Sequence, residues 1–207
     1  MLACLFVAVA AISQVKPRAS ALAPENVKPV SKQLSDFYRI TAESGVQFIF
    51  PVEFRERRVP NNEDFSFDYA MEMPGREFEV WFQVRSQRRD WPVYELSKND
   101  PTKQLENPDS SYVKMGQATA SALSEDKDFA PRIIHRDVLM RYHATAGKSY
   151  LVSLPDLNET RHYKYALILA LQRDHIGRIL VVCFTNNKNP DFFKHVNGIS
   201  RYIRFKA

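Results

Sequence analysis

The sequence predicts an α+β fold, one antiparallel sheet with helices on its faces in the manner of an α/β/α sandwich, and three observations carry this prediction. Residues 65–85 alternate apolar and polar side chains around a Pro-Gly turn, which is typical of a β-hairpin with one apolar and one mainly polar face. Residues 162–185 give a second hairpin pattern that is apolar on both faces, as in central strands covered on both sides. Residues 112–123 and 132–144 carry helical patterns between the two hairpins.

Length and composition favour a single globular domain. The chain has 207 residues, of which 44% are apolar and 26% charged, proportions typical of a chain with a hydrophobic core. The counts of 6 Gly and 12 Pro exclude collagen-like and low-complexity chains, and 2 Cys exclude a disulfide scaffold. We therefore expect one domain over residues 37–207.

The N-terminal segment has the pattern of a signal peptide. An apolar run covers Leu2–Ile12, which is too short to span a bilayer, and Ala21-Leu22-Ala23 has the A-x-A form of a cleavage site. We expect a signal peptide over residues 1–23, cleavage near Ala23, a linker over residues 24–36 and export to the periplasm or the medium. No membrane span is then left on the mature chain. Because no basic residue precedes the apolar run, a retained membrane anchor is the alternative.

The remaining elements follow from turn and breaker residues along the chain. Gly45 favours a turn between two short strands. Gln87–Ser111 contains three prolines and predicts a long connection, and Gly147 is expected to end the second helix. Pro190 favours the start of a third helix. These shorter elements are expected at residues 37–42, 46–50, 149–154 and 200–205 (strands) and 190–198 (helix).

Recognised catalytic and metal motifs are not evident in the sequence. The 5 histidines show no H-x-x-x-H spacing, and we interpret them as surface or capping residues. Gly147-Lys148-Ser149 lacks the first glycine of a phosphate-binding loop, and no G-x-S-x-G elbow is present. We expect no cofactor and no metal. A hydrolase site built from dispersed residues such as His143 and His162 stays as an alternative, because triads assemble from remote positions.

Two groups of residues are candidates for a binding surface. Aromatic residues beside arginines are typical of interface hot spots, and the first group combines the two. Its members are Trp81, Arg85, Arg88, Arg89, Trp91 and Tyr94. The second group is a basic patch on the second helix that would suit an anionic partner. Its members are Arg132, His135, Arg136 and Arg141. The alternatives are that a helix covers Trp81 and that the basic patch is an ordinary solvated face.

The order of these elements, with the turn and breaker residues between them, resembles that of the PsbP/Mog1-like family of α/β/α sandwiches over about residues 37–206. The resemblance rests on a strand ended by proline (Gly45–Pro51), the two hairpins, a helix running into Tyr142-His143-Ala144, and a last strand ending Tyr202–Phe205. It implies a binding scaffold without shared catalytic residues, in a family whose members are often exported accessory proteins.

These observations together predict an exported, non-enzymatic binding or accessory protein of the cell envelope. Its expected partner is another protein or an envelope component. Nucleic acid is disfavoured, because a formal charge of +5 is a small and dispersed excess. A small exported hydrolase is the alternative function.

Overall fold

The computed structural model describes residues 30–59, 61, 66–103, 105–125 and 129–207. The expected signal peptide, its cleavage site and residues 24–29 of the expected linker lie outside this part. Seven strands form one antiparallel sheet in the order β2-β3-β4-β8-β7-β6-β5. Their bounds are β2 Arg55–Arg57, β3 Tyr69–Glu72, β4 Glu79–Ser86, β5 Arg132–Ile133, β6 Ala146–Ser153, β7 Tyr165–Arg173 and β8 Gly177–Thr185.

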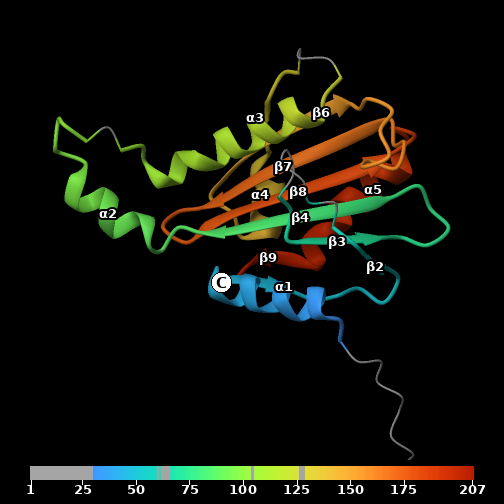
Figure 1. Cartoon of the computed structure of the whole chain (residues 1–207), viewed down its shortest axis with the longest axis horizontal. Coiled ribbons are helices and arrows are strands. Elements are labelled where there is room, and N and C mark those ends of the chain that lie inside the picture. Colours follow the sequence, from blue (N-terminus) through green and yellow to red (C-terminus); the bar gives the residue numbers. More distant parts are fainter. Residues whose placement is uncertain (1–29, 60, 62–65, 104, 126–128) are drawn as a thin grey trace, which may run out of the picture.

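Helices cover both faces of this sheet (Figure 1). Helix α3 (Ser111–Leu123) packs on one face. The other face carries α1 (Lys32–Glu43), α4 (Arg136–Tyr142) and α5 (Pro190–Gly198). A second, two-stranded antiparallel sheet of β1 (Val46–Phe48) and β9 (Ile203–Phe205) lies with these three helices. The predicted α+β class with an antiparallel sheet and helices on its faces is confirmed.

The first predicted hairpin is present as β3 and β4, but the prediction of a mainly polar face is wrong. The turn falls at Pro74-Gly75, where Gly75 has the positive φ of 74° that glycine tolerates. Both faces of β4 are buried, because α3 lies over the face that carries Trp81. The Trp81 side chain is 1% exposed and packs in one cluster with Ala120 and Leu123 of α3. Trp81 therefore leaves the candidate binding surface, and the alternative of a covering helix is confirmed for it.

The second predicted hairpin is present as β7 and β8 at the centre of the sheet. Its residues divide between the two cores, with Leu169 and Leu171 on the α5 face and Ile168 and Ala170 on the α3 face. Cys183 is fully buried in β8, and burial raises the pKa of its thiol. The expectation of apolar central strands is confirmed.

The expected strand over residues 37–42 is wrong, because this segment belongs to helix α1. The helix begins at Lys32, inside the expected linker, and the Ser31 hydroxyl accepts a hydrogen bond from Leu34 N at 3.0 Å as its N-cap. Leu34, Phe37 and Ile40 lie three residues apart and face the core, which is the spacing of a helix. Thr41 is buried and donates its hydroxyl to Phe37 O at 3.0 Å.

The second predicted helix is shorter than expected. Its first residues form β5 instead, because Arg132 and Ile133 pair with Ser149 and Lys148 at the sheet edge. The helix ends at His143, whose φ of 52° is left-handed. Gly147, expected to end it, lies inside β6.

The long connection is also more regular than predicted, since residues 87–111 contain α2 (Asp90–Ser97) and a 3-10 turn at Pro108–Ser110.

Candidate functional site

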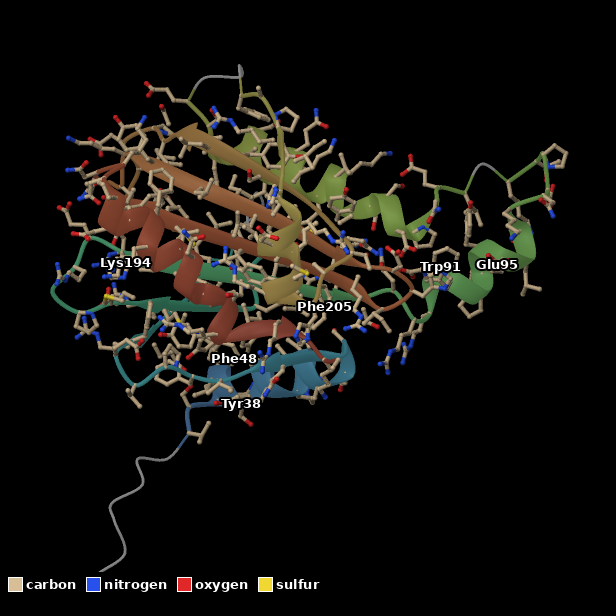
Figure 2. The ribbon with its side chains drawn as sticks, turned by 180° about the vertical axis from the view of Figure 1, so that it is seen from behind. Tyr38, Phe48, Trp91, Glu95, Lys194 and Phe205 are labelled. Atoms are coloured by element: carbon tan, nitrogen blue, oxygen red, sulfur yellow. The ribbon has the colours of Figure 1, made fainter. Side chains whose placement is uncertain are left out.

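The described residues between 87 and 107 belong to an arm that leaves the sheet at the end of β4 and returns to the start of α3. Figure 1 shows its helix α2 set apart from the layers of the sandwich, and Figure 2 shows Trp91 and Glu95 on the arm beyond the end of the sheet. Neither core cluster includes a residue of α2. The arm therefore contributes little to the core.

A buried polar network fixes the root of the arm. The fully buried Gln172 of β7 donates its amide to Gln87 Oε1 at 2.9 Å and to Asp109 Oδ1 at 2.6 Å. Asp109 Oδ1 also accepts from His175 N at 3.0 Å and from Trp91 Nε1 at 3.3 Å. These hydrogen bonds join the root of the arm to β7 and to the β7–β8 turn, whereas Gln172 Oε1 has no partner among the described residues.

Trp91 and Tyr94, the two predicted surface aromatics that lie on the arm, make contacts that hold the arm in place. The Trp91 ring stacks on His175 in the β7–β8 turn, with 3.8 Å between ring centroids and 13° between planes. Tyr94 meets the edge of Trp91 at 5.4 Å. Both side chains are half-buried, so each offers only part of its surface to a partner.

The three predicted arginines line one hollow of about 530 Å³, between the C-terminal end of α1 and the start of α2. Arg85 is neutralised there by Asp68, with 2.7 Å between Nη1 and Oδ2. Arg88 and Arg89 are exposed, and no carboxylate of the described residues lies within 4.0 Å of either. Glu43 and Asp90 line the same hollow but form no ion pair with these two guanidinium groups, which therefore stay open to an anionic group of a partner.

Sequence reasoning missed the apolar side chains of α2. Leu96 is 88% exposed and Val93 56% exposed, three residues apart on the helix. The two apolar residues are visible in the sequence, but they carry no weight when residues 90–97 are taken as part of an irregular connection. Four of the six predicted residues thus lie on the arm and Arg85 lies at the end of β4 next to it, while Val93 and Leu96 belong to the same helix as Trp91 and Tyr94.

The predicted basic patch is divided by a cavity of about 240 Å³ on the α4/α5 side of the sheet. Arg132, His135 and Arg141 line the cavity, whereas Arg136 does not. Arg141 reaches across from α4 to α5, where its Nη2 lies 3.5 Å from Asn197 Oδ1. The patch is therefore the rim of a hollow rather than a uniform helix face.

The two histidines named for a dispersed hydrolase site do not meet. The His143 Nδ1 lies 3.0 Å from Phe205 O. The His162 Nδ1 lies 2.5 Å from Asp156 Oδ1 on an exposed loop. The two histidines lie near opposite ends of β7. Its residues Tyr165 and Gln172, one near each end, are about 24 Å apart along the strand. In the described part of the chain, no three His, Cys, Asp or Glu side chains are grouped so that they could hold a metal.

A second polar cluster lies at the opposite end of the sheet from the arm, and the sequence did not predict it. The Arg161 Nη1 lies 2.5 Å from Glu72 Oε2 and 2.9 Å from Glu79 Oε2. Both carboxylates are buried next to the turn of the β3–β4 hairpin, and Trp81 Nε1 donates to Glu79 Oε1 at 2.7 Å. Arg161 has a φ of 54°, a strained value for a residue with a side chain. The cluster ties the loop before β7 onto the sheet.

The carboxylate of Glu72 also contacts Arg55 and Arg57 of the edge strand β2. Burial raises the pKa of Glu72, but hydrogen bonds from Arg161 and Arg55 outweigh it and leave the pKa below its ordinary value of 4.5. With three cations on two carboxylates, this cluster is a satisfied ion-pair network, so we assign it a structural role.

The sequence matches no known family model and no curated protein. No helix in the described ranges is at once long enough and apolar enough to cross a membrane.

Proposed function

We propose that this chain is an exported binding or accessory protein of the cell envelope, built on a PsbP/Mog1-like sandwich, that holds a protein partner with its arm. One observation carries the proposal: a helix held off the sheet by a buried network exposes Leu96 almost completely. An exposed apolar side chain on a rigidly placed helix can be buried by a partner at little entropic cost.

The chemistry of the arm specifies what the partner would present. Leu96 and Val93 suit an apolar side chain, and the exposed Arg88 and Arg89, just before the helix, suit a carboxylate of the same partner segment. We therefore expect a partner segment in which an acidic residue flanks an apolar one. Burial of Leu96 alone would contribute about 1.5–3 kcal/mol to such a complex.

Site-specific photo-crosslinking in the producing cells tests this function. A photoreactive residue replaces Leu96 in the full chain, and a matched chain carries it at Val52, which is 98% exposed between β1 and β2. We expect one discrete protein adduct from position 96 and none from position 52, and we expect Leu96→Asp to prevent the partner from copurifying. The same adducts from both positions, or none from position 96, would overturn the arm as the binding surface.

Export is tested separately by cell fractionation and mass measurement of a C-terminally tagged chain. We expect an extracytoplasmic product that has lost about 23 residues, in line with cleavage at an A-x-A site. A full-length product in the cytoplasm would overturn the export part of the proposal and leave the arm to be judged by the crosslinks.

A further inference from the structure

The cavity between α4, α5 and the sheet combines an apolar floor with a cationic rim. Its floor is made by Leu169 of β7 and Val196 of α5, each 6% exposed. Phe193 and Ile133 form its lips and are 39% and 86% exposed. An exposed isoleucine beside a hollow of this kind leaves apolar surface that a bound ligand could cover.

The rim of the cavity carries charge of one sign. Arg132 and Arg141 are exposed at the rim, and His135 also lines the cavity, with its Nδ1 3.4 Å from Asp137 Oδ2. Among the described residues, no aspartate or glutamate lines the cavity. In the described ranges no carboxylate lies within 4.0 Å of Arg132 or Arg141, so both guanidinium groups are free to bind an anion.

The volume limits the size of the ligand. A cavity of about 240 Å³ lies slightly below the roughly 300–1,000 Å³ of pockets for drug-sized molecules. At about 30 Å³ for each water-sized volume, the cavity corresponds to roughly eight non-hydrogen atoms.

We propose that this cavity binds a small amphipathic anion, a free carboxylate with an unbranched apolar tail of medium length. The tail lies on Leu169 and Val196, and the carboxylate accepts hydrogen bonds from Arg141 and Arg132. Asn197, which contacts Arg141 between α4 and α5, keeps that guanidinium at the mouth of the cavity. None of the residues that line the cavity belongs to the arm, so this site is independent of the proposed protein partner.

Titration calorimetry with octanoate on the folded chain tests the site. Octanoate has ten non-hydrogen atoms, and octanol and acetate are the matched ligands that lack the charge or the tail. We expect saturable binding of octanoate and binding at least roughly tenfold weaker for octanol and for acetate, because each lacks one half of the recognised chemistry. Methyl NMR signals of Leu169 and Val196 should shift with the same saturation.

Two arginines of the same helix supply the control. Arg141→Gln should weaken octanoate binding roughly tenfold or more, whereas Arg136→Gln, which makes the same charge change outside the cavity, should alter it less than about threefold. Val138→Trp fills the cavity from a half-exposed position and should abolish binding. Absence of octanoate binding, equal effects of the two glutamine variants, or octanol binding as tight as octanoate would overturn the proposal.

Discussion

Removal of the positive charge of Arg161 should destabilise the fold more than the partial exposure of this side chain suggests. In Arg161→Met the buried carboxylate of Glu79, whose side chain is 3% exposed, loses the guanidinium at 2.9 Å and keeps only the hydrogen bond from Trp81. Glu72 loses one cation but keeps Arg55 and Arg57. The substitution therefore leaves one buried charge without a cation, and that residue is Glu79.

The size of the effect follows from the burial of the three groups. Breaking a buried ion pair by removing one partner costs about 3–5 kcal/mol. Because Arg161 is 42% exposed and Glu72 stays paired, we expect a smaller loss of about 2–4 kcal/mol. For a chain of this length each kcal/mol lowers Tm by about 2–4 °C, so Tm should fall by roughly 5–15 °C.

Urea unfolding of four chains isolates the interaction: the natural chain, Arg161→Met, Glu79→Gln and the double variant. A neutral glutamine needs no cation and its amide oxygen still accepts from Trp81, so the double variant should be more stable than the sum of the single losses predicts. Arg39→Met, which breaks only exposed pairs on α1, should cost less than about 0.5 kcal/mol. Additive single losses, or an Arg161→Met chain as stable as the natural one, would refute the reasoning.

Three further outcomes are expected. The lowered pKa of Glu72 adds stability above about pH 4.5 that is lost as the pH falls, so the natural chain and Arg161→Met should differ less in free energy of unfolding at pH 3.5 than at pH 7. Asp109→Ala removes the acceptor shared by Gln172, Trp91 and His175, so limited proteolysis should cut the arm faster. The buried Cys183 should react with a thiol reagent only on unfolding, as followed by absorbance.

The two hairpins were predictable because the apolar pattern of their strands reflects which faces of the sheet are buried. Residues 162–185 are apolar on both faces, and only a central hairpin buries both faces at once. The hairpin at 65–85 was found by its alternation, although its polar positions were misjudged. Trp81 lies between Glu79 and Gln83 on the face that the alternation predicts to be mainly polar, and α3 covers it there.

Helices α1 and α2 were missed for different reasons, whereas α5 begins and ends at the residues predicted for it. The six residues from Phe37 to Ala42 are by themselves compatible with a strand. The helical spacing appears only when Leu34 is included, and the sequence places Leu34 in the expected linker. Helix α2 has eight residues and contributes none to either apolar core cluster, so Val93 and Leu96 are a short signal that does not separate a helix from an irregular connection. The segment over Arg132 and Ile133 became a strand because β6 offered a free edge.

The candidate sites were predictable in residue type but not in arrangement. Arg141 and Arg136 are equivalent in the sequence, yet only Arg141 lines the cavity, because α5 lies on one side of α4 alone. Likewise Arg88 and Trp91 lie three residues apart, but the guanidinium is open while the indole is stacked on His175. Such differences depend on which distant element covers each side chain, and a single sequence does not contain that information.

Buried polar residues mark both ends of the central strands, and this pattern relates the fold to its proposed function. Glu72 and Glu79 lie at one end and bind the loop that carries Arg161, whereas Gln87 and Gln172 lie at the other end and bind the root of the arm. A buried polar group is costly unless it is satisfied, so each pair requires that its irregular segment return to the sheet. The charged pair stabilises a loop that only closes the sheet. The amide pair fixes the direction of a helix whose exposed leucine has no role in the core, and the use of buried hydrogen bonds to place that helix favours a role for it in binding.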